Sequence, residues 1–233
     1  MGTISLEHSD RLYWLGRYTE RFFTTIKALG RQIDKMIGTE HGYNDYIDCF
    51  GIPDVYSDNM EFIRSLLFDK NNSNSAVYSL ERAYDNGIVL REEISTDSLS
   101  FIQMAMDTLS KAEQSNNVRL ALLPLEDIIY GFWGSINEHI YDDEIRNIIY
   151  IGKTIERLDL YIRMKYPFDI VEKEFIRLCK NLNRVPKGTP YRYSTKYLSD
   201  LVEILGTEED YKRYADKAID SLGHLFETEE AFI

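Results

Sequence analysis

The sequence predicts an all-helical protein, and three observations lead to this fold class. Apolar residues recur at spacings of three and four along most of the chain, as on one face of a helix. Runs that alternate apolar and polar residues, which indicate half-buried strands, are hard to find. Glycine and proline, which interrupt helices, number 13 and 5 in 233 residues. We therefore expect residues 1–233 to form a single domain, a multi-helix bundle of about eight helices.

The helices expected in the first part of the chain follow from caps and breaks. The first runs from about Ser5 to Gly38, a length that makes it a spine for the others, and a loop with a short helix follows. Asp58 and Glu61 have capping-box spacing, in which two side chains satisfy free amides of a first turn. This box predicts a helix that continues to about Phe68, where the polar run DKNNSNS ends it.

Five further helices are expected before the clearest loop. Two lie over the segments AVYSLERAYDNGIVLREE and DSLSFIQMAMDTLSKAE. The next opens at Pro124, because proline is tolerated in the first turn of a helix. Another begins at YDDE and ends before Pro167, and Asp169 with Glu172 repeats the capping-box spacing to open a helix to about Leu182. The segment NRVPKGTPYRYS is a loop, and two more helices complete the chain.

The formal net charge of -12 bears on partners and location. An acidic protein repels nucleic acid and anionic membranes, because neutralisation of phosphates by Lys and Arg supplies most of that binding. We expect a partner with a basic surface, and neither nucleic acid nor a membrane. No apolar run reaches the length of a membrane span, and Glu7, Asp10 and Glu20 interrupt the place of a signal peptide. A cytoplasmic location is therefore expected.

The sequence contains no self-sufficient catalytic or metal motif. Cys49 and Cys179 form no CxxC pair and are expected to be buried small residues. His139 lies among acidic residues in NEHIYDDE, but no Glu-x-x-His pair occurs, so we expect no metal. A glycine-rich phosphate loop, HExxH and Gly-x-Ser-x-Gly are also missing, and no cofactor is expected. Catalysis by this chain alone is not supported.

One short pattern occurs twice and supplies most of the candidate site residues. The segment WLGRYTERF at Trp14 aligns without gaps to YIGKTIERL at Tyr150, which gives Gly-(Arg/Lys)-x-x-Glu-Arg twice at an offset of 136 residues. At about 100° per residue, the glycine and the charged side chains of each copy share one arc of a helix, beside an apolar arc. We interpret the copies as an internal pseudo-repeat. Their charged residues are Arg17, Glu20, Arg21, Lys153, Glu156 and Arg157.

Two interpretations of this pattern stay open. In the first, the two helices cross at their glycines, where the missing Cβ permits close approach. Glu20 would then meet Arg157 and Glu156 would meet Arg21 in a buried structural network. In the second, the arginines present guanidinium forks to an anionic ligand or partner, and the glutamates hold the forks in place.

Three segments together resemble the bacterial Alpha-E family. They are LYWLGRYTERF, SLERAYDNGIVLREEIS and IIYIGKTIERLDLYIRM, in the family's order over about residues 5–166, whereas residues 167–233 match poorly. That family is predicted to be all-helical and is named for its helices and its Glu-Arg motif. The resemblance adds Asn86 and Arg91 to the candidate ligand- or partner-binding residues. The middle segment lacks two of the family's cations, and Lys153 stands where an arginine is usual.

The resemblance also implies a function. Alpha-E proteins are associated with ATP-grasp-type ligases and transglutaminase-like peptidases, which implies a non-catalytic accessory subunit in a bacterial peptide-modification system, with a peptide substrate as a further partner. The alternatives are a stand-alone enzyme or an anion- or peptide-binding protein that uses a Glu-Arg pocket, and a purely structural helical protein. A buried carboxylate beside arginines stays ionised and is a weak base, which counts against an enzyme that uses Glu20 or Glu156 as its base.

Overall fold

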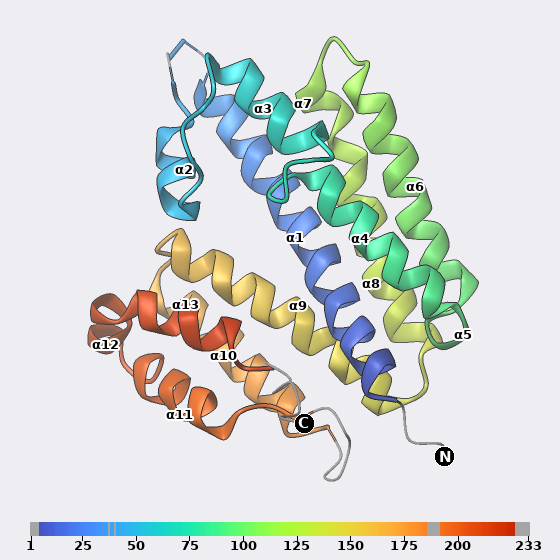
Figure 1. Ribbon diagram of the computed structural model, residues 1–233, viewed down its shortest axis with the longest axis vertical. Coiled ribbons are helices and arrows are strands. Elements are labelled where there is room, and N and C mark those ends of the chain that lie inside the picture. Colours follow the sequence, from blue (N-terminus) through green and yellow to red (C-terminus); the bar gives the residue numbers. More distant parts are fainter. Residues whose placement is uncertain (1–4, 37, 40, 186–191, 227–233) are drawn as a thin grey trace, which may run out of the picture.

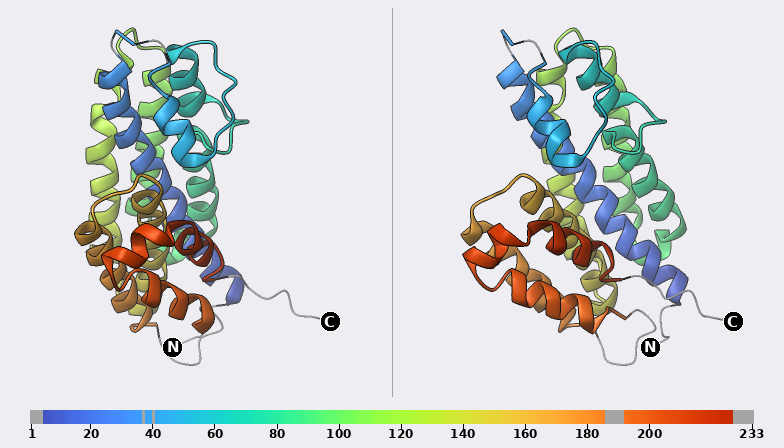
Figure 2. Two further views of the ribbon diagram at one scale, coloured as in Figure 1. Left: turned by 90° about the vertical axis from the view of Figure 1, so that its left-hand side faces the viewer. Right: turned by 60° about the vertical axis from the view of Figure 1, so that its left-hand side comes forward.

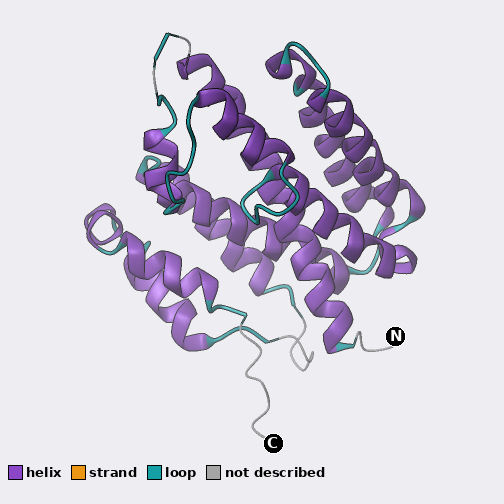
Figure 3. Cartoon of the chain, turned by 45° about the horizontal axis from the view of Figure 1, so that its top comes forward, coloured by secondary structure: helices purple, strands orange, loops and turns teal. Residues whose placement is uncertain are grey.

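The computed structural model describes residues 5–36, 38–39, 41–185 and 192–226, and all regular structure within these ranges is helical (Figure 3). The predicted fold class is confirmed. None of the described helices combines the length and the apolar character that a membrane crossing requires.

The longer helices are α1 (Leu6–Met36), α3 (Asn59–Phe68), α4 (Ala76–Val89), α6 (Thr96–Glu113), α8 (Leu123–His139), α9 (Asp143–Arg163), α10 (Phe168–Leu182), α11 (Thr195–Ile204) and α13 (Ala215–Gly223). Shorter ones lie between them: α2 (Asn44–Phe50), α5 (Arg91–Ile94), α7 (Val118–Ala121) and α12 (Glu208–Arg213).

Helix α1 is the spine of the molecule. It runs diagonally through the middle of Figure 1 and contacts α3, α4, α8 and α9. On one side of α1, helix α6 packs against both α4 and α8. On the other side lies α9, with α10 and α13 packed against it (Figure 2). Helix α1 thus lies between an α4–α6–α8 group and an α9–α13 group, and it is the element best placed to join them.

Local signals account for both ends of α1. The Oγ atom of Ser5 accepts a hydrogen bond from the N–H of His8 at 3.2 Å, which satisfies a free amide of the first turn. After the last helical residue, Met36, the backbone of Gly38 has a φ of +80°. Glycine adopts this left-handed conformation at little cost, and it is the usual residue just past a helix end. The predicted extent of the first helix is confirmed.

The capping box predicted at the start of α3 is present in altered form. Asp58 accepts hydrogen bonds from the N–H groups of Met60 and Glu61, both at 2.8 Å, as an N-cap residue does. Glu61 reaches back to the N–H of Ser57 at 2.6 Å and not to that of Asp58. The carboxylate of Glu61 therefore accepts from the residue before the N-cap and not from the N-cap itself. Helix α3 runs to Phe68 as expected.

The capping box predicted at Asp169 and Glu172 is wrong. Helix α10 begins one residue earlier than Asp169, directly after Pro167, and its N-cap makes no side-chain hydrogen bond. Asp169 instead lies in the first turn, where its negative charge interacts favourably with the positive end of the helix dipole. Its carboxylate also pairs with Lys173 at 3.1 Å. Asp169 and Glu172 therefore have the spacing of a capping box but do not form one.

The helix predicted over AVYSLERAYDNGIVLREE is interrupted. Helix α4 ends at Val89, Leu90 has a φ of -90° and a ψ of 14°, and α5 contains the remaining residues. Leu90 and Ile94 are both fully buried. Residues four apart share one face of a helix, so the burial of both is compatible with a continuous helix as well as with this interrupted one, and the sequence pattern does not mark the break.

The predicted starts of α8 and α9 are confirmed. Helix α8 begins at Leu123 with Pro124 in its first turn. Within the segment YDDE, Asp142 accepts hydrogen bonds from the N–H groups of Glu144 and Ile145 and caps α9. Helix α9 then continues without a break through the second copy of the repeated pattern to Arg163.

Residues 186–191 of the loop predicted over residues 183–194 lie outside the described ranges. Between residues 195 and 226, which the structure describes, the chain forms three helices and not the expected two. The extra division comes at Thr207, whose side chain accepts a hydrogen bond from the N–H of Asp210 and starts α12. Helix α11 packs against α13, and α13 packs against α9. A hydrogen bond from the N–H of Ser194 to the carbonyl of Leu225, 2.9 Å long, joins the two ends of this segment.

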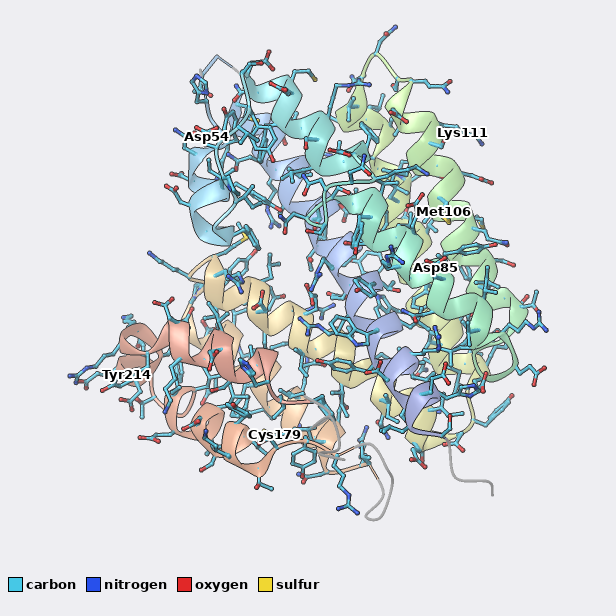
Figure 4. The ribbon with its side chains drawn as sticks, viewed as in Figure 1. Asp54, Asp85, Met106, Lys111, Cys179 and Tyr214 are labelled. Carbon is cyan, nitrogen blue, oxygen red and sulfur yellow. The ribbon has the colours of Figure 1, made fainter. Side chains whose placement is uncertain are left out.

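Both cysteines are free thiols and are half-buried, so the expectation that they are buried core residues is wrong. Figure 4 labels Cys179, which lies on α10. Burial raises the pKa of this thiol above its ordinary value, because the thiolate is poorly solvated there. Cys179 is therefore less reactive than an exposed thiol at neutral pH.

Candidate functional site

Helices α1 and α9 cross in direct backbone contact at Gly16 and Gly152. A Cβ atom placed on Gly16 would overlap the carbonyl oxygen of Ile149, and one placed on Gly152 would overlap the carbonyl oxygen of Tyr13. Ile149 aligns with Tyr13 in the two copies of the pattern. The helices therefore meet through equivalent atoms, and any side chain at either glycine would push them apart. The predicted crossing at the glycines is confirmed.

The two helices run in the same direction. Hydrogen-bonded pairs between them are separated by 135 to 139 residues, and Arg31, further along α1, bonds at a separation of 135 to Tyr166, just after the end of α9. An antiparallel pair would show a separation that changes steadily along the helix. The predicted apolar arcs also face the core, because all of their members are buried: Leu15, Phe22, Ile26, Ile151, Leu158 and Ile162. The internal pseudo-repeat of the whole chain stays a prediction, since this crossing concerns two helices alone.

Glu156 of α9 binds two arginines of α1. Its Oε2 atom accepts a hydrogen bond from Nε of Arg17 at 2.9 Å and one from Nη2 of Arg21 at 3.0 Å, and its Oε1 atom accepts one from Nε of Arg21 at 2.5 Å. Only 8% of the Glu156 side chain is exposed. Burial acts to raise the pKa of Glu156, but Arg21 and Arg17 together outweigh burial and lower it to about 2. Glu156 is therefore ionised at neutral pH.

Glu20 of α1 has the equivalent position but a single arginine partner. Its Oε1 atom accepts a hydrogen bond from Nε of Arg157 at 2.7 Å and lies 2.6 Å from Nη2 of the same arginine in an ion pair. Glu20 is fully buried, and its Oε2 atom has no hydrogen-bond partner among the described residues. Burial raises the pKa of Glu20, and the opposing attraction of Arg157 and Lys153 is the weaker effect. The two glutamates of the repeated pattern thus differ in their electrostatics.

This difference arises at Lys153, which aligns with Arg17. Whereas Arg17 donates to Glu156, no ion pair within 4 Å links Lys153 to a carboxylate in the part of the chain that the structure describes. The Nζ atom of Lys153 instead lies 3.8 Å from the centre of the Trp133 ring. Burial lowers the pKa of Lys153 to about 8, against the attraction of Glu20. An ammonium group lacks the guanidinium fork that would reach Glu20.

A carboxylate that sequence reasoning missed extends the network to α10. Glu174 is 4% exposed, and its Oε1 atom lies 3.7 Å from Nη1 of Arg157, while its Oε2 atom accepts a hydrogen bond from Arg177 at 2.7 Å. One signal could have revealed it. Glu174 lies three residues after Val171 and four before Leu178, on the apolar face of α10. A charged side chain on a buried helix face requires a partner.

Aromatic side chains cover the arginines of α1. The guanidinium carbon of Arg17 lies 5.0 Å from the centre of the Trp14 ring, and that of Arg21 lies 5.7 Å from the Tyr18 ring. The Nη1 atom of Arg17 also donates to the hydroxyl of Tyr13 at 3.3 Å. These contacts leave 12% of the Arg17 side chain and 30% of the Arg21 side chain exposed. Both guanidinium groups are therefore engaged mainly with the protein itself.

Asn86 and Arg91, the candidates from the middle segment, lie outside this network. The side-chain oxygen of Asn86 accepts a long hydrogen bond of 3.5 Å from Arg11, and its amide donates to the carbonyl of Arg82 at 3.1 Å. Arg91 is exposed on the short helix α5. The structure thus gathers the charged residues of the two repeated patterns and places the two middle-segment residues elsewhere.

Two cavities flank the Glu-Arg network and share Thr24 and Leu160 in their walls. The first measures about 270 Å³ and includes Glu20 and Arg157 in its lining. The second measures about 210 Å³ and includes Glu156 and Arg21. In the ranges that the structure describes, no cluster of three His, Cys, Asp or Glu side chains is arranged to hold a metal ion.

The chain matches the model of one protein family over most of its length. That family is described as a predicted alpha-helical domain with a conserved ER motif, and the match covers residues 8–168. These residues include α1 and α9 with both copies of the repeated pattern. No curated protein and no solved structure matches the chain.

Proposed function

The chain belongs to the Alpha-E family, and from this premise we propose that it is a non-catalytic helical subunit acting with an ATP-grasp-type amide ligase or a transglutaminase-like peptidase in a bacterial peptide-modification system. The observation that carries the proposal is the internal pairing of the Glu-Arg motifs. Arg21 and Arg17 bind Glu156, and Arg157 binds Glu20. Five of the six charged candidate residues of the two repeated patterns thus join α1 to α9.

The state of the two glutamates supports a non-catalytic role. A general base works best when its pKa is near the working pH and when it reaches the proton that it removes. The pKa of Glu156 is about 2, far below neutral pH, so it is a weak base. Glu20 has a raised pKa, but it is fully buried and cannot contact a substrate without displacement of its neighbours.

The charge of the chain indicates the kind of surface that the partner presents. A net charge of -12 attracts a basic surface and accelerates encounter with it. Such attraction acts over a Debye length of about 8 Å at physiological ionic strength and weakens as salt is added. We therefore expect association with the partner to be faster and tighter at low salt.

The test is reconstitution with a candidate ligase from the same cell. The two proteins are mixed at two salt concentrations, association is measured by light scattering, and amide formation with ATP is assayed for each protein alone and for the pair. An unrelated helical protein of similar net charge controls for unspecific attraction. We expect a complex that the control does not form and activity that requires the pair. Absence of a complex, or turnover by this chain alone, would contradict the proposal.

A further inference from the structure

The first of the two cavities has walls of a distinctive kind. Helix α1 contributes Glu20, Thr24, Lys27 and Arg31, whose spacing of four, three and four residues places them on one face of the helix. The other walls come from α8, α9 and the turn after α9, and their polar members are Tyr130, Arg157, Tyr161 and Tyr166. The cavity is therefore continuous with the Glu-Arg network and extends it toward the C-terminal end of α1.

The charge balance of this cavity differs from that of the second cavity. Its lining contains the cations Lys27, Arg31 and Arg157 and one carboxylate, Glu20. The lining of the second cavity contains two cations and two carboxylates, which form the pairs Arg21–Glu156 and Arg163–Asp159. Outside the lining, Lys27 and Arg157 each have a further carboxylate within 4 Å, Glu126 and Glu174. Arg31 is therefore the cation of the first cavity that no described carboxylate pairs, and it favours an anionic ligand there.

Two of the three cations have weak protein partners. The Nη2 atom of Arg31 donates to the hydroxyl of Tyr166 at 3.3 Å, and within the described residues Arg31 makes no ion pair with a carboxylate. The Nζ atom of Lys27 lies 3.8 Å from Glu126, near the limit of an ion pair. Both side chains can therefore turn to a ligand at little electrostatic cost.

The third cation is held in place. Glu20 binds Nε and Nη2 of Arg157 from the buried side, and Nη1 lies 3.7 Å from Glu174. A guanidinium fixed in this way loses little freedom when it meets a ligand, so its orientation favours binding. The arrangement also explains why Glu20 lines the cavity although it is fully buried. Glu20 therefore acts in this lining by positioning Arg157.

We propose that this cavity binds a compact oxyanion, the carboxylate or phosphate group of a small ligand, through Lys27, Arg31 and Arg157. Both groups suit guanidinium and ammonium donors. A volume of about 270 Å³ admits a small molecule and no folded segment. The inference does not depend on the protein partner proposed above, because binding to the isolated chain tests it.

The test is titration calorimetry of the full chain with inorganic phosphate and, separately, with glutarate, at constant ionic strength set by chloride. We expect at least one probe to bind at a single site. Lys27→Gln and Arg31→Gln each remove one donor and should weaken binding by about tenfold or more. Arg163→Gln is the matched control, since it removes a cation from the second cavity and should leave binding within about twofold of the unaltered chain. Circular dichroism verifies that each variant is folded.

The two probes distinguish the source of the oxyanion. Binding of phosphate alone assigns a phosphorylated ligand, and binding of glutarate alone assigns a carboxylate ligand. Failure of both probes to bind overturns the proposal. Equal weakening by Arg163→Gln and Arg31→Gln also overturns it, because the effect would then reflect net charge and not this cavity.

Discussion

Arg157 donates a hydrogen bond from Nε to Oε1 of Glu20, a residue 137 positions earlier in the chain, and its Nη2 forms an ion pair with the same oxygen. On the other side of the crossing, Glu156 accepts from Arg17 and Arg21. Because α1 and α9 run in parallel, each glutamate pairs with arginines of the opposite helix and not with those of its own. The charges in the aromatic-rich segment YWLGRYTERFF thus bind the spine helix to α9.

The close approach at the crossing predicts that neither glycine tolerates a side chain. Gly152→Ala places a Cβ on the carbonyl of Tyr13 and should lower the free energy of unfolding by about 3 kcal/mol. Gly134→Ala is the control, because a Cβ there meets nothing within 4 Å and alanine favours the helix interior by about 1 kcal/mol. Urea denaturation measures both. Equal stability of Gly152→Ala and the unaltered chain would show that the helices do not touch at this point.

The lowered pKa of Glu156 predicts a specific dependence of stability on pH. Its pKa is about 2 in the folded chain against its ordinary value of 4.5 in the unfolded chain, so its contribution to stability is complete above about pH 4.5 and is lost as the pH falls toward 2. A shift of this size corresponds to about 3 kcal/mol. The difference in unfolding free energy between the unaltered chain and Glu156→Gln should therefore shrink over this window.

Denaturation curves at several pH values between 2 and 7 check this prediction. Asp169→Asn removes a negative charge from an exposed pair and serves as the control for the change in net charge. A constant difference between Glu156→Gln and the unaltered chain across the whole range would show that Glu156 is not ionised and bound as described.

The unpartnered oxygen of Glu20 predicts a stabilising substitution. In Lys153→Arg, a guanidinium at the position equivalent to Arg17 can donate to Oε2 of Glu20 and still stack on Trp133. We expect the free energy of unfolding to rise by about 1 kcal/mol, the net value of one buried hydrogen bond. Lys173→Arg, at an exposed pair, should have no measurable effect. A loss of stability in Lys153→Arg would indicate that the site around Glu20 has no room for the fork.

Much of the fold and of the network was predictable because the signals are local and repeated. Helical periodicity, with the capping-box spacing at Asp58, predicted helix starts near Ser5, at Asp58 and at YDDE, and side-chain caps are present at all three. The matched placement of Gly16 and Gly152 within two apolar arcs predicted the crossing, since a glycine at such a position permits backbone contact.

What the sequence did not reveal depends on the tertiary structure. The break between α4 and α5 at Leu90 is not marked in the sequence, because the buried residues Gly87, Leu90 and Ile94 keep the spacing of a continuous helix. The start of α10 depends on Pro167 and not on the capping-box spacing that follows it. Arg31 joins the cavity only because the parallel course of α9 brings Tyr166 beside it.

The claim that the Glu-Arg pairs are buried connections between α1 and α9 is tested most directly by a double-mutant cycle on Glu20 and Arg157. Unfolding free energies are measured by urea denaturation for the unaltered chain, Glu20→Gln, Arg157→Gln and the double variant. Each single variant leaves a buried group without its partner and should cost about 3 kcal/mol or more, while the double variant should cost much less than the sum. We predict a coupling energy of about 2 to 3 kcal/mol, and a coupling below about 0.5 kcal/mol, as for an exposed pair, would contradict the account.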